Sequence, residues 1–362
     1  MKHVKKLLAL LLALVMCLAL AACGSGDTET QEPAGDTTTD QTGEETGTEE
    51  TNPETTGTEE TGAADGKTYT IGICQLMQHD ALDAATQGFE DALTEKLGDA
   101  VTFDLQNAQG DTPTCSTIVT GFVSNGYDLI LANATPALQA AMAATSDIPI
   151  LGTSVTDYAT AMNMPDMDAS QGTGLNVSGT SDGVSAQLYA DLVKELVPDA
   201  VNVSILYCSA EANSVLQAEQ FQECMEAMGA TCTVYTFADS NDMQSVVTAA
   251  IENCDALYIP TDNTAASNMT IVANVCQPAG IPVICGEEGM CGNGGLATVS
   301  ISYYDIGYMC GEQAYDILVN GADISTMPIG YSENPVKKYN KDYADAIGFT
   351  MPEGFEVIQT AE

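Results

Sequence analysis

Small polar side chains stand directly after the β-branched segments of this 362-residue chain, in positions that suit ligand binding better than a reaction. After the third segment comes Asn133-Ala134-Thr135-Pro136, and after the fourth comes Gly152-Thr153-Ser154-Val155. Pro136 fits a helix start and leaves backbone N–H groups free beside Thr135. Hydroxyl groups and helix N-terminal amides together favour a bound carboxylate.

The second half of the chain has polar segments at the equivalent positions. Ser209-Ala210-Glu211-Ala212-Asn213 and Thr261-Asp262-Asn263 follow β-branched runs there, and the carboxylate of Asp262 suits a ligand ammonium. Taken singly, each of these side chains is better explained as a helix cap, because Ser, Thr, Asp and Asn cap helices widely. Their concentration at one predicted edge favours binding.

The signatures of catalysis are missing from the sequence. It contains no G-x-x-x-x-G-K-[ST] phosphate loop, no G-x-G-x-x-G after the first strand and no G-x-S-x-G nucleophile elbow. His79 is the only histidine beyond the N-terminal segment, and no nucleophile is paired with it. The adjacent carboxylates of Glu287 and Glu288 are expected to diverge, which disfavours acid–base work. We therefore expect no enzyme, no metal site and no cofactor.

The charge balance excludes another class of function. The chain has 51 acidic residues against nine lysines, and its net charge is −42. Nucleic-acid binding needs a basic surface that replaces the counterions of the phosphate backbone. We therefore expect no nucleic-acid partner.

The N-terminal segment reads as an export signal. Lysines at positions 2, 5 and 6 precede an apolar run, Leu7 to Leu20, which is too short to span a bilayer. The run ends in Leu20-Ala21-Ala22-Cys23, which resembles a bacterial lipobox. This resemblance implies that 1–22 is a lipoprotein signal peptide and that Cys23 carries the lipid. The alternative is an ordinary signal peptide in which Cys23 is incidental.

Residues 23–66 form a predicted tether. After Cys23 the segment is rich in Thr, Glu and Asp and contains no aromatic residue, Leu, Ile or Val. Such a composition buries too little apolar surface to offset the entropy of ordering, so we expect disorder. A solvated spacer between membrane and folded body explains it better than a partner-binding tail.

From Lys67 onward, β-branched runs alternate with amphipathic helical patterns such as His79–Leu97 and Ala265–Ala279. Strand starts near 69, 101, 128 and 148 are followed by a second set near 201, 231, 256 and 281. Strands separated by helices of this length form parallel sheets covered on both faces. The pattern predicts an α/β fold of two Rossmann-like lobes with a ligand cleft between them. We expect an N-terminal lobe of 67–178 plus 300–322 and a C-terminal lobe of 179–299 plus 323–362, with crossovers at Asn176–Gly183 and Val299–Ser302.

Ten cysteines lie beyond Lys67. Several of them fall within predicted strands, where a thiol behaves as a small buried apolar group. We therefore expect mostly free, buried thiols, although export permits disulfides. The two candidate pairs are Cys224 with Cys232 and Cys285 with Cys291.

A set of motifs resembles a known family. The matching segments are QLMQHDALDAATQGF (75–89), NAQGD (107–111), TPALQAA (135–141), SVTD (154–157), NVSGTSD (176–182), LYCSAEANS (206–214), PTDN (260–263) and IPV (281–283). They are similar to the type I substrate-binding lipoproteins of ABC importers, in the branch associated with tryptophan and tyrosine uptake. The resemblance covers nearly all of residues 68–331 and implies a type I periplasmic-binding-protein fold, in which a three-stranded hinge joins two lobes that close on the ligand.

The resemblance also implies how an α-amino acid is held. Its carboxylate would lie at Thr135 and Thr153–Val155, and its ammonium near Asp262. Its side chain would lie against Leu76, Met77 and His79. The complete set of expected ligand-binding residues is Gln75, Leu76, Met77, His79, Asn133, Thr135, Thr153, Ser154, Val155, Ser209, Asn213, Thr261, Asp262, Asn263 and Glu288.

The function predicted from the sequence is an extracytoplasmic receptor for tyrosine, tryptophan or phenylalanine. Its expected partners are the permease and ATPase of an ABC importer, and we expect a monomer held on the outer face of the bacterial cytoplasmic membrane by its lipid. One alternative keeps the fold and changes the ligand to a sugar, nucleoside or purine. Another is a surface adhesion or sensor lipoprotein without a transport role.

Overall fold

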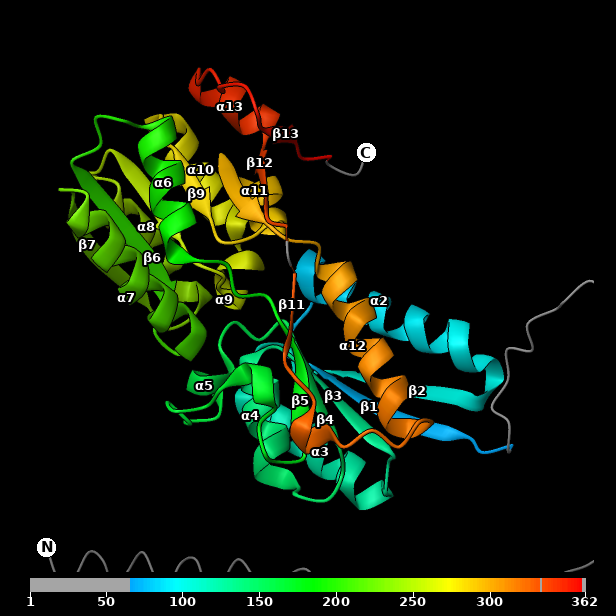
Figure 1. Cartoon of the computed structure of the whole chain (residues 1–362). Helices are drawn as coiled ribbons and strands as arrows, with labels where there is room; N and C mark the ends of the chain where they lie inside the picture. The colour runs from blue at the N-terminus through cyan, green and yellow to red at the C-terminus, as the bar shows by residue number, and fades with distance from the viewer. Residues whose placement is uncertain (1–65, 333, 360–362) are drawn as a thin grey trace, which may run out of the picture. The chain divides into compact units, whose positions relative to one another are not determined.

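The computed structural model describes residues 66–332 and 334–359 (Figure 1). The predicted signal peptide, Cys23 and all but the last residue of the tether lie outside these residues. Among the described residues, no helix has the length and apolar character needed to cross a bilayer. The described chain forms two α/β lobes, each built on its own sheet.

The sheet of the first lobe has six parallel strands in the order β11-β5-β4-β3-β1-β2. The strands are β1 (Tyr69–Gln75), β2 (Val101–Asn107), β3 (Leu129–Asn133), β4 (Ile150–Thr153), β5 (Val177–Ser181) and β11 (Gly330–Tyr331). The helices of this lobe are α2 (Asp80–Leu97), α3 (Thr112–Asn125), α4 (Thr135–Ala144), α5 (Tyr158–Ala161) and α12 (Tyr303–Leu318), with short 3-10 turns at Gly98–Ala100, Ala169–Gln171 and Ile324–Thr326.

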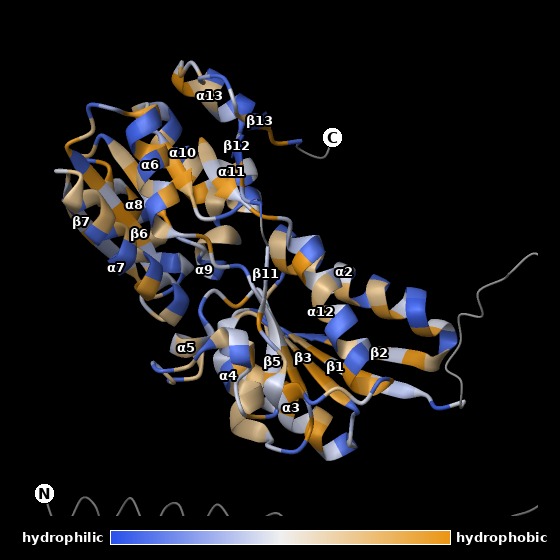
Figure 2. Ribbon diagram, in the orientation of Figure 1, coloured by the Kyte–Doolittle hydropathy of each residue, from blue (hydrophilic) through white to orange (hydrophobic). Residues whose placement is uncertain are grey.

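Both faces of this sheet are covered by helices. Side chains alternate along β1, so that Ile71 and Ile73 pack with Phe89 of α2, whereas Cys74 packs with α3 on the other face. The central strands β1 and β3 are accordingly apolar along most of their length (Figure 2). A parallel sheet that is buried on both faces requires such sequences.

The sheet of the second lobe has seven strands in the order β13-β12-β10-β9-β8-β6-β7. The pairing of β12 with β10 is antiparallel, and every other neighbouring pair is parallel. The strands are β6 (Asn202–Cys208), β7 (Thr231–Phe237), β8 (Ala256–Ile259), β9 (Val283–Cys285), β10 (Ala297–Ser300), β12 (Val336–Tyr339) and β13 (Glu356–Val357). The helices are α6 (Ala186–Leu196), α7 (Ala212–Ala227), α8 (Ser240–Ala250), α9 (Asn263–Ala266), α10 (Met269–Ala279), α11 (Glu288–Gly294) and α13 (Lys341–Ile347).

Three segments of chain connect the two sheets: 182–185, 301–302 and 332–335, of which residue 333 is not described. The structure thus confirms the predicted pair of doubly wound lobes. The first two connections lie close together, because the Tyr303 hydroxyl, directly after the second, donates to Asp182 of the first at 2.7 Å (Figure 1). Closely spaced connections of this kind permit the lobes to rotate about them.

The lobe boundaries differ from those expected. Residues 179–181 were assigned to the C-terminal lobe but belong to β5, in the first sheet. Residues 323–331 were assigned to the same lobe, yet β11 pairs with β5 and Ile329 packs in the core of the first lobe. The small polar residues and the glycine of NVSGTSD suggest a turn, which hides β5 from a pattern based on β-branched residues.

Two helical segments also differ from expectation. The single helix expected at Ala265–Ala279 is divided into α9 and α10, because the chain leaves helical geometry at Ser267 and Asn268. A glycine-rich sequence such as Gly292–Gly295 favours a turn, yet this stretch forms the end of α11.

All ten cysteines of the described residues are free thiols. Seven of them are buried, namely Cys74, Cys115, Cys208, Cys276, Cys285, Cys291 and Cys310. Neither candidate pair is bridged. The buried thiols contribute to the cores of both lobes as apolar groups.

Helices α2 and α12 pack against one another through glycines. A Cβ on Gly88 would lie 2.1 Å from the carbonyl oxygen of Tyr304, and a Cβ on Gly307 would lie 2.0 Å from that of Ala85. The backbones therefore approach more closely than any larger residue allows. This helix contact bears on the site described below. Helix α2 begins next to that site, and α12 directly follows the connection at 301–302.

We predict that Gly88→Ala lowers the unfolding free energy by about 1–3 kcal/mol, since the added methyl group must push two backbones apart. Gly121→Ala is the matched control. It lies in helix α3 with nothing within 4 Å of the new Cβ, so it should be neutral or stabilising by about 0.5–1 kcal/mol. Chemical denaturation of both variants tests the difference, and equal stabilities would contradict it.

Candidate ligand-binding site

The carboxyl ends of β3 and β4 carry two strained residues. Ala134 has φ 89° and Ser154 has φ 54°, although neither is glycine. The Ala134 backbone N–H donates to the Thr153 carbonyl oxygen at 3.0 Å, so the two turns support each other. Backbone strain of this kind costs about 1–3 kcal/mol and gathers at ligand sites. Thr135 begins helix α4 immediately after Ala134 and is buried.

In the second lobe, two buried carboxylates organise the loops that follow β6 and β8. Glu211 accepts hydrogen bonds from the backbone amides of Asn263 and Thr264 at 2.9 and 2.8 Å. Asp262 accepts from the backbone amides of Ala265 and Cys208 at 2.8 and 2.7 Å. Burial and the neighbouring Glu211 raise the pKa of Asp262 to about 8.

Asp262 therefore caps helix α9 and links the loop after β8 to the end of β6. Both of its oxygens already serve backbone N–H groups, so the expected contact with a ligand ammonium would have to compete with them. Ser209, also expected in the site, is exposed and donates to the Phe237 carbonyl oxygen at 3.2 Å, on the β7 side of the lobe.

Side-chain hydrogen bonds join the two lobes, and in each of them at least one partner is uncharged. His79 Nε2 lies 3.1 Å from Asn263 Oδ1, and Ser267 Oγ lies 3.1 Å from Met77 Sδ. At the other side, Gln217 Nε2 lies 3.4 Å from Thr156 Oγ1. Asn293 Nδ2 donates to Asp80 Oδ2 at 2.9 Å. These contacts bring the strand ends of both lobes together.

Several buried polar atoms beside these contacts have no partner. They are His79 Nδ1, Asn133 Oδ1, Ser154 Oγ, Asp182 Oδ1 and Asn213 Oδ1. An unpaired buried polar atom costs about 1–3 kcal/mol, so native proteins rarely leave one without a use. We call His79, Thr135, Ser154, Asp182 and Asn213 the interlobe site.

Hydrogen bonds connect Asn213 of the interlobe site to its surroundings in both lobes. Asn213 Nδ2 donates to the Thr261 carbonyl oxygen at 2.8 Å, and Gln217 Nε2 approaches the same oxygen at 3.5 Å. Gln217 also reaches Thr156 of the first lobe, two residues after Ser154. Next to Asp182 in the chain, the Ser181 hydroxyl donates to the Thr156 carbonyl oxygen at 2.9 Å. Gln217 thus links the part of the site in the second lobe to Thr156 of the first lobe.

Asp182 is the residue that sequence reasoning missed. It lies in the first connection between the lobes, is 4% exposed and accepts a hydrogen bond from the Tyr303 hydroxyl at 2.7 Å. Burial raises its pKa. Asp182 ends the NVSGTSD segment. The sequence pattern indicates a crossover there, whereas the structure has a strand directly before Asp182.

Other expected residues support the site from within the first lobe. The Thr86 hydroxyl donates to Gln75 Oε1 at 2.7 Å and accepts from Asn133 Nδ2 at 2.9 Å, which ties α2 to the ends of β1 and β3. A further group is fully or almost fully buried at the strand ends, namely Leu76, Thr153 and Val155.

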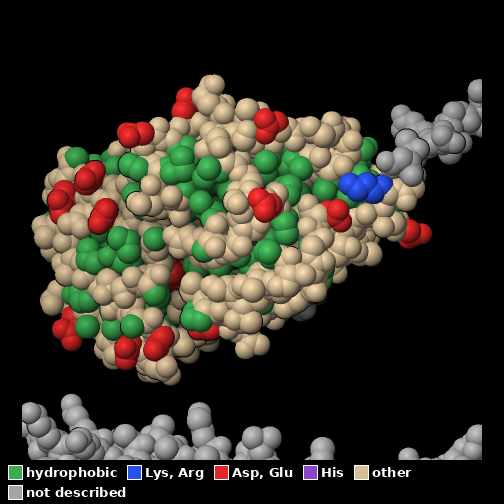
Figure 3. Space-filling view, turned by 90° about the horizontal axis from the view of Figure 1, so that it is seen from below, with side chains coloured by type: hydrophobic (Ala, Val, Ile, Leu, Met, Phe, Trp, Pro, Cys, Tyr) green, Lys and Arg blue, Asp and Glu red, His purple; other side chains and the backbone are tan. Residues whose placement is uncertain are grey.

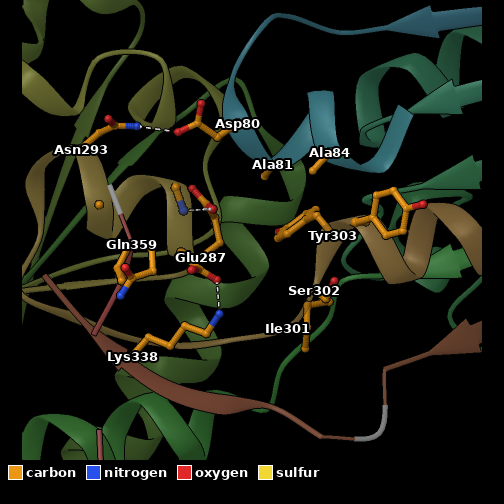
Figure 4. A pocket seen from close by; sticks show the side chains of 15 residues that line it. Asp80, Ala81, Ala84, Glu287, Asn293, Ile301, Ser302, Tyr303, Lys338 and Gln359 are labelled. Atoms are coloured by element: carbon orange, nitrogen blue, oxygen red, sulfur yellow. Dashed lines mark hydrogen bonds and ion pairs between the residues drawn. The ribbon is translucent and has the colours of Figure 1, made fainter. Parts of the chain in front are cut away.

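A cavity of about 610 Å³ lies beside the connections between the lobes (Figure 4). Its lining includes Asp80, Glu287 and Tyr303. Of the expected site residues only Glu288 lines it, where it forms an ion pair with Lys338 at 2.5 Å. The cavity adjoins the interlobe site, because the Tyr303 hydroxyl in its lining donates to Asp182 at 2.7 Å. Among the described residues, no cluster of three or more His, Cys, Asp or Glu side chains is arranged to hold a metal ion.

Glu287 lines this cavity, and the charge of its carboxyl group depends on pH near neutrality. Its carboxylate caps α11 by accepting from the Gly289 and Met290 amides at 2.5 Å each, and burial raises its pKa to about 7. A carboxyl whose pKa is raised on folding stabilises the fold fully below its unfolded pKa, near 4.5. That contribution, about 3 kcal/mol, is lost as the pH rises through 7.

We predict that Glu287→Gln reduces the rise in thermal midpoint between pH 7.5 and pH 5, because the variant has no carboxyl to protonate. Glu353→Gln, at an exposed position, is the control and should keep the wild-type pH dependence. Differential scanning calorimetry across this range measures both. A wild-type slope in Glu287→Gln would show that the group does not titrate in this window.

Comparison with known proteins shows which family this chain belongs to. Residues 70–361 match the family model described as "ABC transporter substrate binding protein". A tyrosine-binding protein of Clostridioides difficile (strain R20291) is 37% identical over 284 residues, covering 78% of this chain and 81% of that protein.

Two solved structures are similar over 81% of this chain and the whole of theirs. The complex of an ABC domain with L-Trp from Streptococcus pneumoniae is 33% identical, with a TM-score of 0.76. The ligand-free, open structure of a substrate-binding protein with adhesive properties from Clostridium difficile is 38% identical, with a TM-score of 0.62. These similarities confirm the predicted type I periplasmic-binding-protein fold. The chain belongs to the ABC transporter substrate-binding protein family, whose members serve importers outside the cytoplasm.

Proposed function

We propose that this chain binds a free aromatic amino acid between its lobes and delivers it to the permease and ATPase of an ABC importer. The observation that carries this proposal is the set of unpaired buried atoms in the interlobe site. Asp182 Oδ1 and Asn213 Oδ1 are acceptors, and Ser154 Oγ is a hydroxyl that can donate. A zwitterion needs acceptors for its ammonium and donors for its carboxylate.

The ammonium is assigned to Asp182 and Asn213. Because Asn213 Nδ2 donates to the Thr261 carbonyl oxygen, its Oδ1 is left as an acceptor. Asp182 keeps one oxygen free while Tyr303 donates to the other. A buried carboxylate without a positive partner is costly, and a ligand ammonium would supply that partner. This assignment replaces Asp262, whose oxygens are already used.

The carboxylate is assigned to Thr135 and Ser154 in the first lobe. The Ser154 hydroxyl is buried without a partner, and helix α4 begins at Thr135 with no side chain capping its first amides. A helix N-terminus attracts an anion through its free N–H groups and its dipole. The strained turn at Ser154 orients that hydroxyl at the same edge of the sheet.

The ligand side chain is assigned to the surface formed by Leu76, Met77 and His79. The chain contains no tryptophan, so these residues and nearby tyrosines supply the apolar contact. The names of two relatives support an aromatic side chain, since one is a tyrosine-binding protein and the other is a complex with L-Trp.

The arrangement of the lobes also supports a ligand-binding cycle. The similarity is greater to the L-Trp complex, at TM-score 0.76, than to the open, ligand-free structure, at 0.62, although the second is the more similar in sequence. This chain therefore has its lobes nearer to the ligand-bound arrangement. Rotation of the lobes about their connections is a motion that would produce such a difference, which supports the proposed cycle.

We further propose that the receptor is held at the outer face of the cytoplasmic membrane by a lipid on Cys23, and that it acts as a monomer without catalysis. The lipobox-like end of the signal segment supports the anchor. A site that is complete within one chain supports the monomer.

A second candidate role is adhesion at the cell surface. One relative is described as a substrate-binding protein with adhesive properties, and an acidic tether would hold the folded lobes away from the membrane. This role is compatible with ligand binding and does not replace it.

Isothermal titration of the full chain with L-tyrosine, L-tryptophan and L-phenylalanine tests the proposal. At least one should bind with a measurable heat, and Asp182→Asn should weaken that binding tenfold or more, because a charge-assisted hydrogen bond contributes about 1.5–3 kcal/mol. Asp305→Asn, exposed at the start of α12, is the matched control and should bind as the wild type. The absence of heat with all three amino acids would exclude the function, and wild-type affinity in Asp182→Asn would exclude the assignment of the ammonium.

A further inference from the structure

We propose that His79 selects ligands whose aromatic ring carries a hydrogen-bond donor, so that a phenol or an indole is accepted and a plain phenyl ring is discriminated against. This inference rests on the proposed function and concerns the same site. It follows from a chain of hydrogen bonds whose direction is fixed at one end by a carboxylate that can only accept.

The first link is the buried carboxylate of Glu211. Its Oε2 accepts from the Asn263 backbone amide at 2.9 Å and from Asn263 Nδ2 at 2.7 Å, and its Oε1 accepts from Thr264 N and Oγ1 at 2.8 Å each. An ionised carboxylate has no hydrogen to donate. The side-chain amide of Asn263 must therefore turn its NH₂ group toward Glu211 and its oxygen away from it.

The second link joins the lobes. Asn263 Oδ1 lies 3.1 Å from His79 Nε2. Because Oδ1 can only accept, Nε2 must carry the hydrogen. A neutral imidazole has one hydrogen, so Nδ1 is then a bare acceptor. Burial lowers the pKa of His79, although Glu211, Asp83 and Asp80 oppose that shift, and the neutral ring is consistent with this.

The third step is the environment of Nδ1. This atom is buried and has no protein partner. The ring stands between the lobes, because His79 precedes α2 of the first lobe and its other nitrogen contacts α9 of the second. The nearby side chain of Met77 is a thioether, which accepts from Ser267 and has no hydrogen to donate. A donor for Nδ1 must come from the ligand or from water.

The consequence is a rule about ligand chemistry. The hydroxyl of tyrosine and the indole N–H of tryptophan are donors, whereas the phenyl ring of phenylalanine has none and the ether oxygen of O-methyltyrosine only accepts. Two relatives that are more than 30% identical to this chain are named for a ligand, a tyrosine-binding protein and an L-Trp complex, and both ligands are in the donor class. A site with a buried acceptor rejects a ligand that leaves it unpaired, by a factor that reaches 10⁴ or more in the strongest cases.

The experiment is a titration of the full chain with L-tyrosine, L-tryptophan, L-phenylalanine and O-methyl-L-tyrosine. In the wild type we expect the better of the two donor ligands to bind at least tenfold more tightly than phenylalanine or the ether. His79→Phe keeps a ring but removes the acceptor, so this ratio should fall to near one. His79→Asn keeps an acceptor close to the position of Nδ1 and should retain part of the ratio.

The ratio of affinities is the readout, because a general loss of binding through a damaged site would weaken all ligands together. Equal binding of donor and non-donor ligands by the wild type would overturn this inference and leave the proposed function intact. So would an unchanged ratio in His79→Phe. Binding of none of the four would overturn the proposed function and this inference with it. Should His79→Phe fail to fold, the wild-type ratio and that of His79→Asn decide the question.

Discussion

The cost of burying a polar atom without a partner is the constraint on which the arrangement of this molecule depends. Parallel sheets place the carboxyl ends of their strands at one edge, and here two such edges face each other. The polar groups at those ends are removed from water when the lobes meet. Most of them are paired within the protein, as Asp262 and Glu211 are with backbone amides. Others, among them Asp182, Asn213, Ser154 and His79, each keep a buried atom without a protein partner, and our proposal is that a ligand between the lobes pairs them.

The acidic composition makes the choice of partner more specific. With a net charge of −42, the chain has few cations of its own to pair with a buried carboxylate. Acidic side chains are spread over the face seen in Figure 3, and basic ones gather at one end of it. The ion pairs among the described residues each stay within a single lobe, as Lys338 with Glu288 does. A ligand ammonium is therefore a natural counterion for Asp182, since no lysine of the described chain forms an ion pair with it.

The sequence predicted the lobes well because apolar strands and amphipathic helices are local patterns. Strands β7 (Thr231–Phe237) and β8 (Ala256–Ile259) begin at the expected positions. Strand β5 was missed because NVSGTSD resembles a turn, and its place is set by pairing with β4 across the sheet. The roles of Asp262 and Asp182 could not be separated from sequence either. Both are aspartates after strands, and only the three-dimensional structure shows that backbone amides occupy one and leave an oxygen of the other free.

The contacts between the lobes explain how such a site can be both closed and reversible. They consist of hydrogen bonds such as His79 with Asn263 and Gln217 with Thr156, and no ion pair among the described residues crosses from one lobe to the other. Each bond of this kind contributes only about 1 kcal/mol net. The unpaired atoms that closure buries cost a similar amount or more. A ligand that pairs these atoms removes that cost in the closed form alone, and a ligand can shift an equilibrium only by such a difference in affinity between the two states.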